Sequence, residues 1–368
     1  MNKLAKVVVA LTAAGTLALS GCGGGRTATT APEPGASAAG GFAKDSVIGV
    51  ALPQKTSENW VLAETLFKDG LASAGYKADV QFANNGPSEQ QNQIQAMVAK
   101  GAKVLIVGAV DGTQLGSQVK AAKDSGATVV AYDRLLTNTD AVDYYVAFDN
   151  FKVGQLQGEA LLQGLAAKKP AGPYNVELIA GSPDDSNSKV FFSGAMDVLQ
   201  PKIDDGTLKV VSKQTTFEQV STQGWKAENA QKRMDTVLSG SYSGSTALDG
   251  VLSPNDTLAR AALTSVRAAG KPLPVITGQD SEVESVKLIM KGDQYSTIYK
   301  DTRRLVEHAI VMINDLQAGK APEVNDSESY NNGVKVVPSY LLEPVIVTKD
   351  NAAEVYVNDT TLAPLTKA

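Results

Sequence analysis

Val47-Ile48-Gly49-Val50-Ala51-Leu52, followed by a helical pattern and then by Ala78-Asp79-Val80-Gln81-Phe82, decides the fold class of this chain. The first run is apolar throughout, as in a strand that is buried on both faces of its sheet. The same alternation continues along the chain, with apolar runs at 104–107 and 128–131 and helical patterns at 90–100 and 115–125. Continuous Val and Ile runs separated by helices are typical of βαβ units and of a parallel sheet covered on both faces.

A second set of apolar runs begins after Tyr144-Tyr145-Val146-Ala147-Phe148. Strands are predicted at 176–179, 208–211, 248–252 and 274–276, with helices between them. The pattern therefore predicts an α/β protein with two doubly wound parallel-sheet domains. The length of 368 residues agrees, since domains usually have roughly 100–200 residues each.

The composition excludes several classes of site. Hydrophobic residues make up 43% and charged residues 20%, which is ordinary for a globular protein. The single histidine, His308, excludes zinc sites with two imidazoles and leaves little room for a Ser-His-Asp triad. The single cysteine, Cys22, excludes an internal disulfide and a thiolate metal cluster. These kinds of metal site are therefore excluded, and hydrolytic chemistry is disfavoured.

The charge distribution argues against a nucleic-acid partner. The first 44 residues hold Lys3, Lys6, Arg26 and Lys44 against Glu33 alone, so the rest of the chain is more acidic than the formal net charge of −5 indicates. Non-specific nucleic-acid affinity depends on clustered Lys and Arg side chains, and the sequence contains no basic run.

The first residues have the features of an export signal. Lys3 and Lys6 precede an apolar run, residues 7–19, which is short and rich in small residues. Such a run fits a secretory signal peptide and not a spanning helix. Leu19-Ser20-Gly21-Cys22 follows and is similar to the lipobox of bacterial lipoproteins, in which the cysteine is lipidated and becomes the mature N-terminus.

The lipobox predicts a membrane anchor. Residues 1–21 are expected to be removed and Cys22 to be lipidated, the alternative being a chance cysteine beside an ordinary cleavage site. Two or three lipid chains would hold the protein on the outer face of the cytoplasmic membrane, in a periplasm or at a cell surface. The Gly-, Thr- and Pro-rich composition of residues 22–44 predicts a flexible linker, and the folded part is expected to start near Asp45.

Polar and aromatic side chains follow the predicted strands in both halves of the chain. Open α/β sheets bind ligands beyond the carboxyl ends of their strands. Carboxylate, amide and guanidinium groups can each hold adjacent hydroxyls of a monosaccharide, and an aromatic ring can cover its apolar C–H face. Each residue alone could instead be a helix cap, a turn former or part of the core. Their shared position at strand ends of both halves favours binding.

Six motifs stand in order along the chain. They are Ala131-Tyr132-Asp133-Arg134, Ala147-Phe148-Asp149-Asn150, Gly181-Ser182-Pro183-Asp184-Asp185, Leu252-Ser253-Pro254-Asn255-Asp256, Thr277-Gly278-Gln279-Asp280 and Tyr295-Ser296-Thr297-Ile298-Tyr299-Lys300-Asp301. Together they resemble the sugar-binding proteins of ABC importers. Within that family the chain is most similar to xylose-binding and multiple-sugar-binding receptors, which accept aldoses such as xylose, glucose, galactose and arabinose. The resemblance spans residue 46 to about residue 360.

The resemblance implies a type I periplasmic binding protein, whose two lobes are joined by a hinge of three chain crossings. The crossings are expected near Phe148-Asp149, near Lys300-Asp301 and within residues 337–341. The expected N-terminal lobe therefore comprises residues 45–148 plus 301–340, and the expected C-terminal lobe comprises residues 149–300 plus 341–368. Closure about such a hinge would bury the ligand and let a membrane partner distinguish loaded from empty receptor.

The resemblance also implies roles for individual residues. Asp133 and Arg134 would hold ring hydroxyls from the first lobe. From the second lobe, Asn187 and Asn255 would donate, and Asp280 would accept. The complete set of expected ligand-binding residues is Asn59, Trp60, Asp133, Arg134, Asp149, Asn187, Trp225, Asn255, Asp280 and Lys300. Trp60 and Trp225 would sandwich the sugar ring, although ribose binders have two adjacent aromatics where this chain has Trp60 alone. Lys55 and Glu58 are further candidates in the same loop.

The implied function is that of a membrane-tethered solute-binding lipoprotein that captures a monosaccharide and delivers it to the permease of an ABC importer. The resemblance further implies a monomer with no enzymatic activity, no cofactor and no metal site, and it leaves open whether a chemoreceptor or sensor kinase is an additional partner. The alternative is a receptor for an autoinducer, a nucleoside or a polyol. A regulator of the lac-repressor type would need DNA-binding helices where this chain has a signal peptide and a linker. A glycosidase would need carboxylates on opposite sides of the bond, which the neighbours Asp184 and Asp185 do not provide.

Overall fold

The computed structural model describes residues 41–55 and 57–367. The predicted signal peptide, the predicted lipidation site Cys22 and most of the predicted linker lie outside these residues. The described part contains two parallel sheets, each with helices on both faces, and a small antiparallel sheet.

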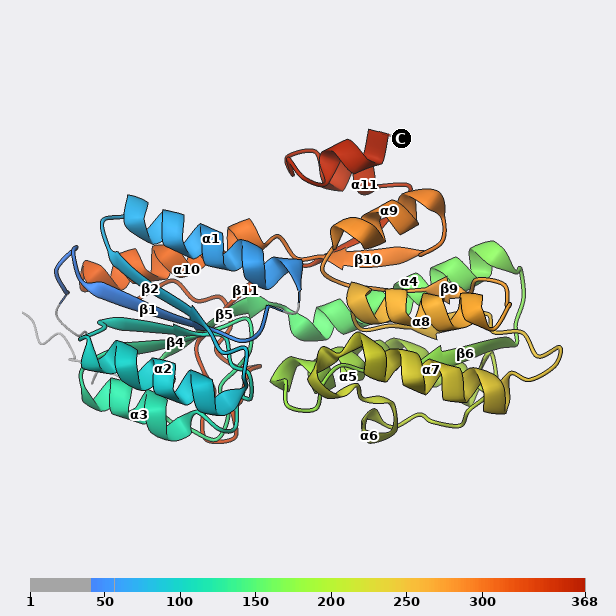
Figure 1. Ribbon diagram of the computed structural model, residues 1–368, viewed down its shortest axis with the longest axis horizontal. Coiled ribbons are helices and arrows are strands. Elements are labelled where there is room, and N and C mark those ends of the chain that lie inside the picture. Colours follow the sequence, from blue (N-terminus) through green and yellow to red (C-terminus); the bar gives the residue numbers. More distant parts are fainter. Residues whose placement is uncertain (1–40, 56, 368) are drawn as a thin grey trace, which may run out of the picture. The chain divides into compact units, whose positions relative to one another are not determined.

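The first lobe, residues 41–148 and 302–342, is built on a six-stranded parallel sheet in the order β11-β5-β4-β3-β1-β2 (Figure 1). Its strands are β1 (Val47–Leu52), β2 (Lys77–Phe82), β3 (Val104–Val107), β4 (Thr128–Tyr132), β5 (Tyr144–Phe148) and β11 (Ser339–Leu342). Its helices are α1 (Glu58–Ser73), α2 (Pro87–Ala99), α3 (Gly116–Asp124) and α10 (Thr302–Gln317).

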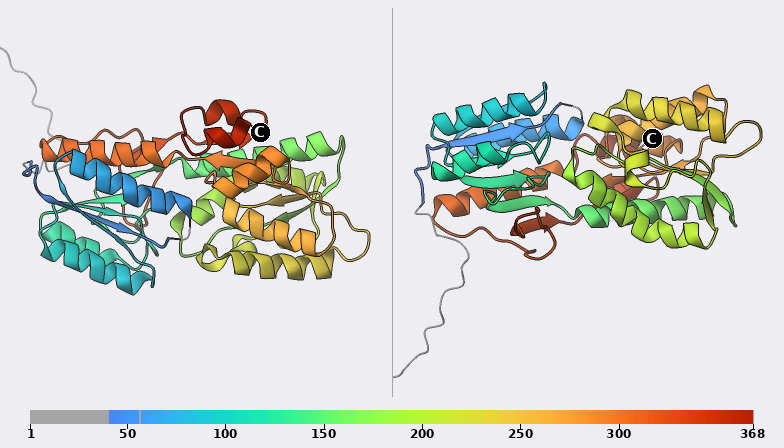
Figure 2. Two further views of the ribbon diagram at one scale, coloured as in Figure 1. Left: turned by 45° about the horizontal axis from the view of Figure 1, so that its top comes forward. Right: turned by 90° about the horizontal axis from the view of Figure 1, so that it is seen from below.

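The apolar run that begins the fold is buried on both sides, as predicted. Successive side chains of a strand point to opposite faces. Ile48, Val50 and Leu52 of β1 therefore pack against α1 and α10, whereas Ala51 packs against α2 and α3. The views of Figure 2 show the same two helix layers around this sheet. Because neither face of β1 meets water, apolar residues do not need to alternate with polar residues along this strand.

The second lobe, residues 150–299 and 345–367, contains a four-stranded parallel sheet in the order β7-β6-β8-β9. Its strands are β6 (Tyr174–Leu178), β7 (Leu208–Val210), β8 (Gly250–Leu252) and β9 (Val275–Ile276). Its helices are α4 (Asn150–Lys168), α5 (Ser186–Asp204), α7 (Ala227–Ser241) and α8 (Asp256–Ala268), with the short α6 (Phe217–Val220) and η1 (Gln223–Trp225) between them. The pair α4 and α5 packs on one face of the sheet, and α7 and α8 pack on the other.

The second lobe also contains a small antiparallel sheet, which the sequence pattern did not predict. It pairs β10 (Ser296–Tyr299) with β12 (Val345–Thr348). The helices α9 (Val283–Lys291), α11 (Ala352–Val355) and η2 (Ala363–Lys367) surround it, with the fully buried Tyr356 at the centre of their shared core.

The chain passes between the lobes three times, from β5 to α4, from β10 to α10 and from β11 to β12. The first two crossings lie where they were expected. The third lies slightly later, because Leu342 of β11 still pairs with Phe148 of β5 in the six-stranded sheet. The first lobe therefore extends through residue 342, beyond the expected limit at residue 340.

The folded part also begins earlier than expected. The ring of Phe42 lies 6.2 Å from that of Tyr76 and packs against the first-lobe core. Gln317 of α10 donates a hydrogen bond from Nε2 to the carbonyl of Phe42 at 2.9 Å. These contacts place Phe42 in the first lobe, so the end of the linker at residue 44 was predicted too late.

Candidate ligand-binding site

A cleft lies between the two lobes. The cleft is lined by residues that end or follow strands of both sheets and by the first turns of α1, α5 and α10. The lining residues are Ser57, Asn59, Trp60, Tyr132, Asp133, Arg134, Phe148, Asp185, Asn187, Phe191, Trp225, Asn255, Gln279, Asp280, Lys300, Thr302 and Leu305.

The structure brings together all the expected ligand-binding residues except Asp149. Asp149 is instead the N-cap of α4, where its Oδ1 accepts a hydrogen bond from the backbone N–H of Lys152 at 3.0 Å. Its carboxylate is therefore used at the hinge, and the expectation that it lines the cleft was wrong. Lys55 also lies outside the cleft and pairs with Glu64 at 2.9 Å.

One buried lysine lies between two carboxylates. Lys300 Nζ is 3.3 Å from Asp280 Oδ1 and 4.0 Å from Asp133 Oδ2. Burial lowers the pKa of Lys300, but the two carboxylates more than offset this effect, so its pKa lies above the usual value. Burial raises the pKa of Asp133, and the positive charge of Lys300 opposes that rise. The site thus combines a charged ammonium with two hydrogen-bond acceptors.

A second charged group joins the two lobes. Arg134 Nε of the first lobe lies 2.9 Å from Asp185 Oδ2 of the second lobe. The same Oδ2 accepts a hydrogen bond from the indole N–H of Trp225 at 3.0 Å. The guanidinium carbon of Arg134 lies 5.4 Å from the centre of the Trp60 ring, within the range of a cation–π contact. The Asp185 carboxylate therefore orients both the guanidinium of Arg134, from the first lobe, and the indole of Trp225, from the second lobe.

The indole of Trp225 is positioned by its backbone and by a glycine. Trp225 has a φ of 55°, a left-handed conformation that is uncommon outside glycine, and it follows Gly224, whose φ is 67°. The ring lies so close to Gly181 that a Cβ there would come within 2.1 Å of the indole. Only glycine fits at residue 181, which explains why the motif from Gly181 to Asp185 begins with glycine. Strained backbone at a cleft often marks a functional position.

The carboxylate-bearing residues Asp133 and Asp280 also have left-handed backbone, with φ of 60° and 93°. Hydrogen bonds fix both conformations. The carbonyl of Asp133 accepts from Asn187 Nδ2 at 2.8 Å and from the hydroxyl of Tyr145 at 2.5 Å, and the N–H of Asp280 donates to the carbonyl of Ile298 at 2.9 Å. These hydrogen bonds hold the backbone from which the two carboxylates extend into the cleft.

Asn255 shows that capping and cleft lining are compatible. It is the N-cap of α8, and its Oδ1 accepts a hydrogen bond from the N–H of Leu258 at 2.9 Å. This bond fixes the amide and leaves its Nδ2 as the donor for a ligand. Asn59 is also engaged, since its Nδ2 lies 3.4 Å from the carbonyl of Asp280 in the other lobe.

Gln279 is a cleft residue that the sequence analysis did not select. Its side chain is 3% exposed, and Oε1 has no hydrogen-bond partner among the residues that the structure describes. Its Nε2 lies 3.5 Å from Asp280 Oδ1, so the carbonyl oxygen is the free atom. Buried polar atoms rarely lack partners, and a ligand hydroxyl would satisfy this one. Its place shortly after the end of β9, next to Asp280, was the signal that could have identified it.

The other unselected residues add apolar surface and a few polar groups. Tyr132 and Phe148 end β4 and β5, and their positions also follow from the strand-end rule. Phe191 and Leu305 lie within helices, where no strand-end signal exists. Among residues 41–55 and 57–367, no group of three or more His, Cys, Asp or Glu side chains could hold a metal ion.

Two lobes with parallel sheets, three crossings between them and a polar, aromatic cleft define a receptor that closes around a small ligand. Residues 48–321 match the periplasmic binding protein domain. This chain therefore belongs to the periplasmic binding protein family. The match confirms the predicted fold, and the family consists of transport receptors and not of enzymes, as predicted.

Two curated relatives and one solved structure are similar over most of the chain. The multiple sugar-binding periplasmic receptor ChvE of Rhizobium radiobacter is 47% identical, over 86% of this chain and 91% of that protein. The D-xylose-binding periplasmic protein of Escherichia coli (strain K12) is 36% identical, over 86% and 91%. The crystal structure of an ABC transporter solute binding protein from Clostridium phytofermentans with bound β-D-glucose is 39% identical in sequence and has a TM-score of 0.83. The match covers 88% of this chain and 100% of that chain.

Proposed function

We propose that the protein captures an aldose, such as xylose or glucose, by closure of its lobes and delivers it to an ABC importer. The observation that carries this proposal is the meeting of acceptors, donors and two indoles from both lobes in one cleft. The similar proteins support it, because one is a multiple sugar-binding receptor, one is a D-xylose-binding protein and one has bound β-D-glucose.

Each kind of group in the cleft has a task on a pyranose ring. The carboxylates of Asp133 and Asp280 accept hydrogen bonds from hydroxyls, whereas Arg134 and Asn255 donate them. Lys300 keeps the two carboxylates in one small volume by balancing their charge. Trp60 and Trp225 cover the apolar C–H faces of the ring. These assignments rest on geometry and on the residue types.

A thermal-shift panel tests the proposal. A ligand that binds only the folded state stabilises it by about 2.7 kcal/mol at a hundredfold excess over Kd. We expect D-xylose, D-glucose, D-galactose or L-arabinose to raise the melting temperature. A shift with adenosine or with a polyol such as myo-inositol, and with none of the aldoses, would establish the alternative ligand class instead.

Trp225 is expected to report sugar binding by its fluorescence. The sugar replaces water at the indole, so the emission should shift when an aldose is added. Trp225→Ala should weaken binding by about 2 kcal/mol through lost apolar contact, and Trp225→Phe, which keeps a flat ring but loses the bond to Asp185, by about 1 kcal/mol. Fluorescence and calorimetric titrations measure both effects. A lower melting temperature with an unchanged Kd would instead show a purely structural tryptophan.

We also propose that the protein is lipid-anchored at Cys22. The lipobox sequence supports this anchor, and the named relatives are periplasmic receptors. None of the helices in the described part of the chain is long and apolar enough to cross a membrane. In cells, we expect the processed protein to partition into the detergent phase and the Cys22→Ala variant to appear in the soluble fraction with unchanged sugar affinity. Equal membrane retention of the processed variant would contradict the anchor.

The closed receptor is the form that a membrane partner recognises in this proposal. The permease of the importer is the first such partner, and a chemoreceptor or sensor kinase is proposed as a second. The monomeric state remains a prediction. Co-purification of the sugar-loaded protein with each membrane partner, compared with the sugar-free protein, tests these interactions.

A further inference from the structure

A contact between the lobes lies at the edge of the cleft, outside the ligand-lining residues. Glu58 is the first residue of α1 in the first lobe, and its Oε2 accepts a hydrogen bond from the N–H of Val283 at 3.0 Å. Val283 is the first residue of α9 in the second lobe. Glu58 was a sequence-based candidate for ligand contact, but it is not among the residues that line the cleft.

The N-cap side chain of α9 does not bind the first N–H groups of the helix. The first N–H groups of a helix have no partner within the helix and carry a partial positive charge. Glu282 is the N-cap residue of α9, but it makes no side-chain cap hydrogen bond. Its carboxylate is instead bound by Arg260 Nη2 at 2.5 Å and by Thr257 Oγ1 at 2.9 Å. Asp256 Oδ2 of the same lobe accepts a hydrogen bond from the N–H of Glu282 at 2.9 Å, but the N–H of Val283, the first helical residue, is bound by Glu58 of the opposite lobe.

We propose that Glu58 is a positioning residue that stabilises the closed receptor by capping α9 across the cleft. This inference rests on the proposed function. The two residues belong to different lobes, so opening of the lobes separates them and returns both groups to water. The contact therefore favours the closed state over the open state.

The position of Glu58 predicts its effect on different ligands. An interaction that stabilises the closed state without touching the ligand changes the population of the binding-competent form. The apparent Kd then changes by the same factor for every sugar. A residue that touches the ligand would instead change the ratio of affinities for sugars that differ in one group, such as D-xylose and D-glucose.

The test compares Glu58→Ala with wild-type protein by calorimetric titration with D-xylose and with D-glucose. We expect both Kd values to rise by the same factor, about two- to fivefold, which corresponds to the usual contribution of an exposed carboxylate at a helix N-terminus. Stopped-flow fluorescence should show faster sugar release. Glu58→Gln keeps an oxygen acceptor but loses the charge, so its Kd values should fall between those of the wild type and of Glu58→Ala.

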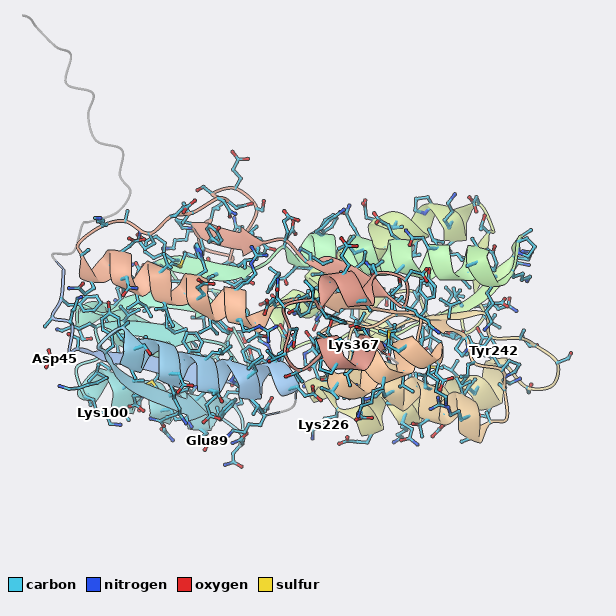
Figure 3. All side chains as sticks on the ribbon, turned by 90° about the horizontal axis from the view of Figure 1, so that it is seen from above. Asp45, Glu89, Lys100, Lys226, Tyr242 and Lys367 are labelled. Carbon is cyan, nitrogen blue, oxygen red and sulfur yellow. The ribbon has the colours of Figure 1, made fainter. Side chains whose placement is uncertain are left out.

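Glu89 offers a matched control. It lies in the first turn of α2, and its Oε2 accepts a hydrogen bond from the N–H of Asn85 at 2.8 Å. The donor and the acceptor of this bond are both in the first lobe, where Figure 3 labels Glu89. Glu89→Ala therefore removes the same carboxylate from a helix start without affecting an interlobe contact. We expect a small fall in melting temperature for both alanine variants, and weaker sugar binding for Glu58→Ala alone.

Two results would overturn the role of Glu58. The first is Kd values for both sugars equal to those of the wild type, and the second is a changed ratio of the two Kd values, which would make Glu58 a ligand contact. Failure of the proposed function looks different, because the wild-type protein itself would then bind neither sugar, and the role of Glu58 would fall with it.

Discussion

Replacing Arg134 by alanine is expected to weaken aldose binding by about 3 kcal/mol, which is more than a hundredfold in Kd. The guanidinium is buried, and its Nε lies 2.9 Å from Asp185 Oδ2. Without it, the ligand loses a donor, and the buried Asp185 carboxylate loses its cation in the closed cleft. Removing one partner of such a pair usually costs roughly 2–5 kcal/mol of binding. Titration calorimetry with the aldose that binds most tightly measures the loss.

Arg267 provides the control for this experiment. It forms an ion pair with Asp293 at 2.9 Å, but its side chain is 45% exposed and lies outside the cleft. Arg267→Ala should leave the Kd unchanged and reduce the unfolding free energy by at most about 1 kcal/mol, the range of a surface ion pair. A Kd of Arg134→Ala within about threefold of wild type would show that Arg134 does not contact the ligand.

Replacing Lys300 by methionine is expected to reduce the unfolding free energy by about 3–5 kcal/mol at neutral pH and to abolish tight sugar binding. The ammonium lies between Asp133 and Asp280, and methionine has a similar length without the charge. Two buried carboxylates would then lack their shared cation. Urea denaturation at pH 7.5 measures the change in unfolding free energy.

The same variant should depend on pH in a defined direction. Burial already raises the pKa of Asp133, and loss of Lys300 removes an effect that lowers it. Between the ordinary pKa of an aspartate and this raised value, the folded variant holds a proton that the unfolded chain has released. Its stability therefore increases as the pH falls through that window. The difference in unfolding free energy between variant and wild type should be smaller at pH 5 than at pH 7.5.

Lys287 is the matched control for charge removal. It pairs with Glu284 on the exposed face of α9, outside the cleft. Lys287→Met should change stability little, and by the same amount at both pH values. If the stability deficit of Lys300→Met were the same at pH 5 and pH 7.5, repulsion between the buried carboxylates would not be its cause.

The parallel strands were predictable because a strand that is buried on both faces has an almost continuous run of apolar residues. Val104-Leu105-Ile106-Val107, for example, is completely buried and has no polar residue. The antiparallel pair of β10 and β12 was not predictable in the same way. Its strands are four residues long, and β12 is only partly buried. Their pairing depends on the position of segments that are distant in sequence, which periodicity does not encode.

The candidate site was predictable where strand geometry determines it. Asp133 follows β4 of the first lobe, whereas Asn255 and Asp280 follow β8 and β9 of the second lobe, and the carboxyl ends of both sheets border the cleft. Asp149 satisfies the same rule but caps α4, because the rule does not distinguish a cap from a cleft residue. Phe191 lies within α5, and its place in the cleft depends on how that helix packs.

The pairing of β11 with β5 has a consequence for the order in which the protein folds. The partners Ser339 and Tyr145 are separated in the chain by almost the whole second lobe. In a chain that leaves the cell from its N-terminus, the sheet of the first lobe stays incomplete until residue 342 has crossed the membrane. Until then the edge of β5 lacks its partner strand and is available for wrong pairing. Such distant pairing also slows folding, so the interval between translocation and the native state is the period in which this protein most needs a chaperone.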